Sequence, residues 1–203
     1  MLKFISPDFV FHKQITNHTE LKSRLFPEAL RTCVEAPDDW NCDVLTSRKA
    51  TDIDYSPFLT AFKPVVTALC DTIGTRGPVE LRIESLWMNL YNKGSWQELH
   101  HHSSQSNNLS FVYFLNYNPE TDGHFFFLNE RSNHYSASGL HGVFKLSENL
   151  NIGEFNPFPV QEGDVIIFPS QLRHGVAMQR HSTNRCTLAG NLFVLPQFDK
   201  PGV

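Results

Sequence analysis

The sequence predicts a mainly β protein in which a β-sandwich or jelly roll is supported on one face by N-terminal helices. Two segments before residue 74 carry apolar residues at helical spacing, whereas the chain after Pro78 consists of short apolar or aromatic runs separated by turn formers. No helical pattern interrupts those runs, which is typical of antiparallel sheets rather than of alternating α/β folds. The 203 residues, 40% of them hydrophobic, suffice for one domain with a substantial core.

The two helical segments come first in the chain. The first helix is expected over about residues 19–35, with Asn17 or Thr19 as its cap. Its apolar stripe consists of Leu21, Leu25, Leu30 and Val34. The second helix is expected over about residues 57–73, and Gly74 ends it. Its apolar face consists of Phe58, Phe62, Val65, Val66, Leu69 and Ile73. Each helix thus has one apolar side to bury against a sheet.

The strands follow in the second part of the chain. We expect them over residues 81–91, 109–115, 124–128, 155–160, 165–168 and 187–194, with turns at 92–94, 116–123, 162–164 and 183–184. The whole chain, 1–203, is therefore interpreted as a single domain, with helical support over 1–77 and a β core over 78–197. The stretch 129–153 is rich in Ser, Asn, Gly and His, and we predict it to be a loop that forms part of a substrate gate.

Composition and charge exclude several classes of function. With 17 basic and 21 acidic residues the net charge is −4, which argues against nucleic-acid binding as the main function. No apolar run is long enough to span a membrane, and the N-terminus does not resemble a signal peptide. The four cysteines are scattered without CxxC spacing, which favours a reducing compartment over a disulfide scaffold. The sequence therefore predicts a cytoplasmic protein without a membrane partner.

The densest polar feature is the triplet His100-His101-His102, which follows the strand-like run 87–91 and the turn at Gly94. In an extended segment His100 and His102 would point to one side and His101 to the other. Two imidazoles on one side can bind a single metal ion, and a further ligand must then come from elsewhere in the chain. Taken alone, the triplet is better explained as a solvated histidine loop than as a metal site.

The candidate for the further ligand is His174. It opens a strand after the turn at Gly163-Asp164, the buried run 165–168 and a tight loop. A jelly roll brings strands that are distant in sequence side by side, so a separation of 74 positions from His100 is compatible with one shared site.

A second polar feature begins eleven residues after His174, where Arg185 opens an apolar strand and Thr187 shares its face. A guanidinium at the start of a strand, backed by a hydroxyl, is well suited to bind a carboxylate. Taken alone, an arginine at the rim of a sheet that pairs with an Asp or Glu is the simpler interpretation.

The ordered series is far more specific than its parts. It consists of His-x-His, then a distal His, then Arg-x-Thr, all on short strands, and it resembles the prolyl-hydroxylase-like branch of the Fe(II)/2-oxoglutarate-dependent dioxygenases. The resemblance covers about residues 80–195. The segments that carry it are Tyr91-Asn92-Lys93-Gly94, His100-x-His102, Val112-Tyr113-Phe114-Leu115-Asn116, Asp122-Gly123, Gly163–Val176 and Arg185-x-Thr187.

Three segments make the chain similar in particular to small oxygenases of this superfamily found in marine bacteria and their phages. They are Trp87-Met88-Asn89-Leu90-Tyr91, Gln97-Glu98-Leu99-His100-His101-His102 and Phe168-Pro169-Ser170-Gln171-Leu172-Arg173-His174-Gly175-Val176. The resemblance implies a double-stranded β-helix and a reaction in which Fe(II), 2-oxoglutarate and O2 are used. The products would be succinate, CO2 and a hydroxylated substrate, either a small molecule or a peptidyl group.

The same resemblance implies roles for individual residues. His100 and His174 would bind the iron. Arg185 would pair with the distal carboxylate of 2-oxoglutarate, with support from Thr187. Tyr91 and Tyr113 would make further contacts to the co-substrate. The neighbour of Tyr113, Phe114, is the alternative occupant of that last position.

One position departs from the family pattern. The usual third ligand is an Asp or Glu, and this chain has His102 there. We interpret His102 as the third ligand by its position. Three neutral imidazoles carry one negative charge less than the usual set and attract Fe(II) less strongly. The alternatives are a water molecule, Asp164 or Glu98.

Two other classes of function are compatible with parts of this pattern. A cupin-like metalloprotein could use the same histidines with zinc, nickel or manganese, and a non-enzymatic β-sandwich could serve as a binding or structural module. Arg185 argues against the first, because a hydrolytic zinc site needs no buried partner for a carboxylate. The ordered series argues against the second, because a binding module has no need of those residue types at those spacings.

Overall fold

The computed structural model describes residues 8–129, 155–181 and 183–197. Within these ranges the helices are α1 (His18–Thr32) and α2 (Ser56–Ile73). The strands are β1 (Phe11–Gln14), β2 (Leu45–Thr46), β3 (Val79–Tyr91), β4 (Gln97–His100), β5 (Leu109–Asn116), β6 (Phe125–Leu128), β7 (Phe155–Pro157), β8 (Asp164–Pro169), β9 (His174–Val176) and β10 (Arg185–Pro196).

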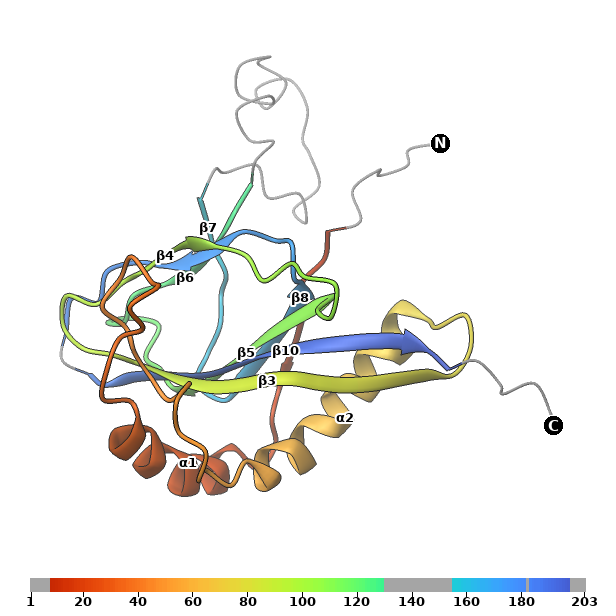
Figure 1. Cartoon of the computed structure of the whole chain (residues 1–203), viewed down its shortest axis with the longest axis horizontal. Helices are drawn as coiled ribbons and strands as arrows, with labels where there is room; N and C mark the ends of the chain where they lie inside the picture. The colour runs from red at the N-terminus through yellow and green to blue at the C-terminus, as the bar shows by residue number, and fades with distance from the viewer. Residues whose placement is uncertain (1–7, 130–154, 182, 198–203) are drawn as a thin grey trace, which may run out of the picture.

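The strands form two antiparallel sheets. The larger sheet has the order β1-β8-β5-β10-β3-β2, and the smaller has the order β4-β9-β6-β7. In Figure 1 the smaller sheet lies above the larger one, α1 lies below the larger sheet, and α2 starts below it and rises at the right past β3 and β10. This arrangement is the double-stranded β-helix with flanking helices that the sequence predicted.

The helices pack on the outer face of the larger sheet. Their buried residues join the residues of that sheet that point toward the helices in one apolar cluster, among them Phe58, Phe62, Met88, Phe111 and Leu188. As predicted, α2 ends before Gly74, whose φ of 79° suits glycine. The side chain of Ile73, however, is exposed.

The apolar stripe predicted for the first helix is wrong in its second half. α1 buries Leu21, Leu25 and Ala29, which lie four residues apart on one side. The helix ends at Thr32, so Val34 falls beyond it and is 70% exposed. Leu30 points to solvent as well. Asn17 stands at the cap position but makes no capping hydrogen bond with its side chain.

The six predicted strand ranges are present with shifted ends, and so is the short strand β9 that His174 was predicted to open, whereas three other short strands were not predicted. β1, β2 and β4 are only two to four residues long, too short for an alternating pattern to be visible. β1 pairs with β8, and β2 pairs with β3. The segment predicted as helical support, 1–77, therefore also contributes strands to the larger sheet.

A second apolar cluster fills the space between the two sheets. Phe114, Ile166 and Phe168 project from the larger sheet and Phe125, Phe127 and Val176 from the smaller one. Most of the predicted loop at 129–153 lies outside the described residues. Neither described helix is long and apolar enough to cross a lipid bilayer.

Candidate functional site

Three histidines meet in the space between the sheets. His100 at the end of β4 is paired directly with His174 at the start of β9. His102 lies two residues beyond β4 and turns back toward them, so that one ring nitrogen from each residue lies within 4.8 Å of the others. The ring centroids are 4.3 to 5.3 Å apart. His101 is exposed on the other side of the chain, as the alternation of side chains predicted.

Backbone groups fix the orientation of these rings. Nδ1 of His174 lies 2.8 Å from the carbonyl oxygen of Leu172, and Nδ1 of His100 lies 2.7 Å from that of Glu98. With a proton on Nδ1, each of these two histidines donates a hydrogen bond to its carbonyl oxygen, and its Nε2 keeps a lone pair that can bind a metal ion. The backbone of His102 is held in turn, because its N–H donates to the carbonyl of Ser170 at 2.9 Å.

Burial keeps the three imidazoles neutral. Desolvation lowers the pKa of His102 to about 4, lowers that of His100, and lowers that of His174 well below its usual value. The positive charge that the other histidines would carry lowers the pKa of His102 and His174 further. At neutral pH the site therefore offers three lone pairs without prior loss of protons, which is what a divalent metal ion requires.

Acidification is therefore expected to destabilise the metal-free protein. Unfolded histidines titrate near pH 6.5 and these folded ones below it, so unfolding takes up protons between the two values. The contribution of these histidines to the free energy of unfolding is fully present above about pH 6.5. Between that pH and about pH 4 it falls by roughly 1.4 kcal/mol per pH unit for each proton taken up on unfolding. Urea unfolding at pH 7, 6 and 5 measures this slope. The exposed His101→Ala should retain it, whereas His174→Ala should flatten it; an unchanged slope in His174→Ala would contradict the assignment.

Arg185 forms the opposite end of the site and is completely buried, with 0% of its surface exposed. It opens β10, as predicted, and its guanidinium carbon lies 4.4 Å from the ring centre of Tyr91, 5.4 Å from that of Tyr117 and 5.9 Å from that of Phe114. None of its three guanidinium nitrogens has a hydrogen-bond partner among the residues that the structure describes. A buried cation of this kind requires an anionic partner to offset its desolvation.

The walls between Arg185 and the histidines come mainly from β3 and β10. The cavity is lined by Tyr91, Asn89 and Trp87 on β3 and by Thr187 and Ala189 on β10. In the register of the two strands Tyr91 lies opposite Arg185 and Asn89 opposite Thr187. Tyr91 donates its hydroxyl to Oε1 of Gln97 at 2.7 Å, and burial raises the pKa of this tyrosine to about 12, so it stays protonated.

Sequence reasoning did not single out Trp87, Asn89 or Tyr117 as residues of the site. Nε1 of Trp87 and Oδ1 of Asn89 are buried without hydrogen-bond partners in the described part of the chain, and the Trp87 ring lies 5.7 Å from that of His102. Period-two alternation back from Tyr91 would have indicated Asn89 and Trp87. No comparable signal marks Tyr117, because it lies just beyond the end of β5.

Tyr113 is not brought together with the other predicted residues. It lies on the helix side of β5, among Phe58 and Phe111, and its hydroxyl lies 2.7 Å from Nδ1 of His18. Its neighbour Phe114 faces the space between the sheets instead. A shift of one residue along a strand reverses the face, so the prediction that Tyr113 contacts the co-substrate places it on the wrong side of the sheet.

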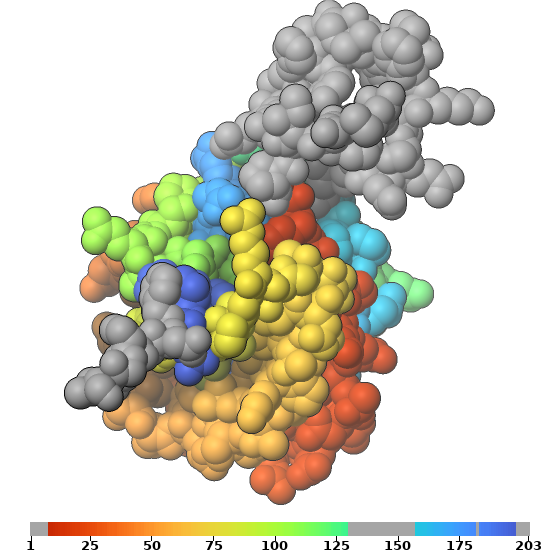
Figure 2. Space-filling view, turned by 90° about the vertical axis from the view of Figure 1, so that its right-hand side faces the viewer, coloured from red at the N-terminus to blue at the C-terminus, as the bar shows by residue number. Residues whose placement is uncertain are grey.

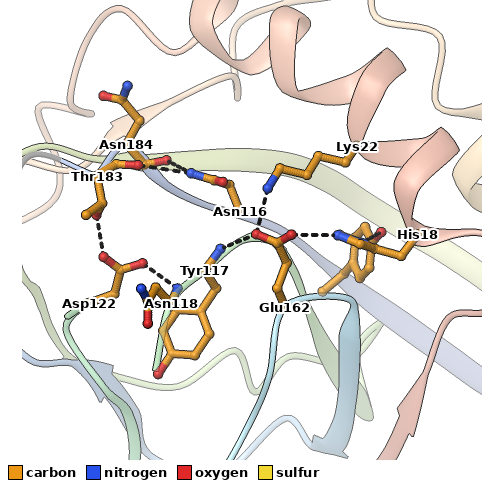
Figure 3. A network of polar contacts seen from close by, with 10 residues as sticks. His18, Lys22, Asn116, Tyr117, Asn118, Asp122, Glu162, Thr183 and Asn184 are labelled. Carbon is orange, nitrogen blue, oxygen red and sulfur yellow. Dashed lines mark hydrogen bonds and ion pairs between the residues drawn. The ribbon is translucent and has the colours of Figure 1, made fainter. Parts of the chain in front are cut away.

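A polar network holds the turn that carries Tyr117 (Figure 3). Glu162 accepts hydrogen bonds from the Tyr117 backbone N–H at 3.1 Å and from Nζ of Lys22 at 2.7 Å, and its other oxygen lies 3.1 Å from Nε2 of His18. Helix α1 is thereby tied to the loop before β8 and to the end of β5.

A second polar network centres on Gln179, in the segment between β9 and β10. Gln179 is fully buried and joins three turns: its backbone carbonyl accepts from Gly94 N–H, its Oε1 accepts from Gly123 N–H, and its Nε2 donates to Asp122. Asp122 also accepts hydrogen bonds from the hydroxyl of Thr183 and from the Asn118 backbone (Figure 3). The backbone that leads into Arg185 is fixed by these bonds.

The two carboxylates considered as alternative ligands lie in other contacts. Asp164 is 2.8 Å from Nε2 of His12 and accepts the Gln161 N–H, and Glu98 accepts the Asn41 N–H at 3.2 Å. Within the described ranges no carboxylate oxygen joins the nitrogens of the three histidines. Three neutral imidazoles are a fitting donor set for a divalent transition metal, iron included.

Comparison with known proteins agrees with this geometry. A family profile described as "Putative 2OG-Fe(II) oxygenase" matches residues 85–191, just over half of the chain, which includes the three histidines and Arg185. A search of curated proteins returns no match.

Solved structures share the fold at low sequence identity. An oxidoreductase of the 2OG-Fe(II) oxygenase family from Burkholderia pseudomallei aligns with a TM-score of 0.60 and 18% identity over 91% of this chain and 85% of that one. A Pseudomonas putida prolyl-4-hydroxylase aligns with a TM-score of 0.55 and 13% sequence identity, over 95% of each chain. The third structure is that of the epimerase SnoN from nogalamycin biosynthesis, in complex with Fe3+, alpha ketoglutarate and nogalamycin RO. It aligns with a TM-score of 0.61 and 15% sequence identity, over 96% of this chain and 86% of that one.

Proposed function

The chain belongs to the 2OG-Fe(II) oxygenase family, whose members use Fe(II) and 2-oxoglutarate, and on that basis we propose that it hydroxylates a small-molecule or peptidyl substrate that is not yet identified. In this reaction 2-oxoglutarate and O2 are converted to succinate and CO2. We assign His100, His102 and His174 as the iron ligands. The iron, when bound, supplies the oxidative chemistry, and the protein supplies orientation and a cavity from which water is largely excluded.

The buried Arg185 is the observation that carries the proposal. A fully buried guanidinium without a hydrogen-bond partner in the described residues, in a cavity that also contains three convergent histidines, supports binding of an anion between them. A guanidinium offers two parallel N–H donors to a carboxylate. A dicarboxylate keto acid has one carboxylate for Arg185 and a keto acid group for the metal, so it matches both ends of the cavity.

Other residues are assigned supporting roles. Thr187 follows Arg185 on the same face of β10 and has a hydroxyl to offer the same carboxylate. The rings of Tyr91, Tyr117 and Phe114 hold the guanidinium plane in place. Hydrolysis at a cupin-like zinc site would leave the buried Arg185 without a function, which favours the oxygenase over that alternative.

Anaerobic addition of Fe(II) to the metal-stripped protein, followed by titration with 2-oxoglutarate, is expected to produce a weak visible absorption band that saturates at one equivalent per chain. The band reports a keto acid bound to protein-held iron, because neither component alone absorbs there. Succinate, which lacks the keto group, is the matched control and should give no band. Retained metal without a band would favour the cupin-like alternative, and loss of both would favour a binding module.

A further inference from the structure

One edge of the larger sheet is open over half of its length. β10 pairs with β3 along the whole strand, from Tyr91 to Val79. On the other side β2 pairs only with Leu90 and Asn89, and the backbone of Met88 bonds to Ser47. Among the described residues no strand pairs with this edge between residues 79 and 87. Figure 1 shows this half of β3 extending beyond the smaller sheet. An open strand edge is a template for another strand.

The backbone groups that face this open edge can be identified. The N–H of Gln197 donates to the carbonyl of Pro78 at 2.9 Å, which points that carbonyl toward β10. Backbone groups alternate in direction along a strand, so those of Val79, Leu81 and Ile83 point away from β10. The alternation is interrupted after Ile83 by a bulge at Glu84, where the register with Asn191 and Leu192 shifts. The usable edge therefore runs from Val79 to Ile83.

The side chains at this edge divide into an apolar and a charged face. Ile83 lies opposite Leu192, which belongs to the apolar cluster on the helix side, so Leu81 and Ile83 face that side as well. Both are 40% exposed, and Ile73 at the end of α2 is 57% exposed. Figure 2 shows the start of β3 at the surface between α2 and the end of β10. The opposite face carries Glu80 and Arg82, paired at 2.8 Å.

We propose that a second copy of this chain adds to this edge, with the two β3 strands antiparallel about a two-fold axis at Leu81. Each Leu81 would then exchange two backbone hydrogen bonds with its counterpart, and Val79 would lie opposite Ile83 of the second copy. Glu80 would lie opposite Arg82 of the second copy, on both sides of the axis. The exposed apolar side chains, with Ile73, would be covered at the same time.

Charge selects this register over its neighbour. With the axis at Arg82 the backbone groups of Leu81 and Ile83 could still bond, but Arg82 would oppose Arg82 of the second copy and Glu80 would lose the opposite charge of Arg82. Like charges directly opposite each other are destabilising, whereas two Glu–Arg pairs are favourable. The pairing is short, and interfaces at the small end of the usual range are weak, so we expect dissociation in the micromolar range.

Sedimentation velocity over a concentration series tests the proposal. The wild-type chain should shift from the mass of one chain to that of two. Glu80→Arg or Arg82→Glu replaces two attractive pairs by two repulsive ones and should weaken the dimer by roughly 30-fold. The double variant Glu80→Arg/Arg82→Glu restores opposite charges and should restore the dimer. The melting temperatures of these exposed variants should stay close to that of the wild type.

A backbone variant separates strand pairing from side-chain association. Leu81→Pro removes an N–H that faces the open edge and leaves the bonds to β10 intact, so it should abolish the dimer in a folded chain. A wild-type chain that stays monomeric up to about 100 μM, well above the expected range, would overturn the proposal. So would a dimer that survives both single charge reversals. Because no arm of the experiment uses metal or co-substrate, its failure is independent of the proposed oxygenase activity.

Discussion

Arg185→Met is expected to abolish binding of 2-oxoglutarate and at the same time to raise the free energy of unfolding of the ligand-free protein. The guanidinium is completely buried and has no carboxylate partner in the described structure, and its described contacts are with the aromatic side chains of Tyr91, Tyr117 and Phe114. Replacing a buried charge by an apolar side chain of similar size often stabilises a protein by about 1–4 kcal/mol. Loss of one partner of a buried charged pair weakens binding by roughly 100-fold or more.

Two measurements check this pair of expectations. Calorimetric titration of the metal-loaded protein with 2-oxoglutarate measures affinity, and urea unfolding without ligand measures stability. Arg24→Met is a suitable control, because Arg24 is an exposed residue of α1 that pairs with Glu20 and should change neither quantity appreciably. Unchanged affinity in Arg185→Met would refute the role assigned to Arg185. Lower stability would show that the aromatic rings compensate the buried charge in full.

Single alanine substitutions at His100, His102 and His174 are each expected to weaken Fe(II) binding by roughly 100-fold or more, whereas His101→Ala leaves it unchanged. Even residues that only orient a metal ligand typically contribute 10- to 100-fold, so loss of a ligand should cost at least as much. The four positions form a matched series, since His101 lies between two candidate ligands but is exposed.

Iron bound per chain after anaerobic dialysis measures the effect, and circular dichroism confirms that each variant folds. The His102 variant decides whether an imidazole takes the place of the usual carboxylate. Full occupancy in His102→Ala would show a site held by two histidines, while loss of metal in His101→Ala would mean that the triplet is oriented in the opposite way.

The sequence predicted the residues whose positions follow from local alternation. His100 and His102 share a side, His174 and Arg185 each open a strand, and Thr187 follows Arg185 on one face. These features depend on the two-residue period of extended chain and on the order of short motifs, both of which are visible in one sequence. The two helices and most of the strands were predictable for the same reason.

The other features of the fold and of the site depend on contacts between residues distant in sequence, which the periodicity of the sequence does not reveal. His18 and Glu162 are 144 positions apart, and Gln179 meets Asp122 and Gly123 from a separate turn. The choice between Tyr113 and Phe114 required knowledge of which face of β5 the helices cover, and adjacent aromatic residues give no hint of it. β1 has the mostly polar sequence FHKQ, which does not predict a strand, and it pairs with the edge of β8.

The two ends of the site belong to different sheets. His100 and His174 lie on the smaller sheet, and Arg185 lies on the larger one. A co-substrate held at both ends acts as a cross-link between the two layers, so its affinity depends on the distance between them. That distance is set by the aromatic residues that fill the interior, such as Phe125 and Phe168, whose rings pack 6.0 Å apart. Substitutions that change the thickness of this packing will therefore alter co-substrate affinity even though they remove none of the side chains that bind the metal or the co-substrate.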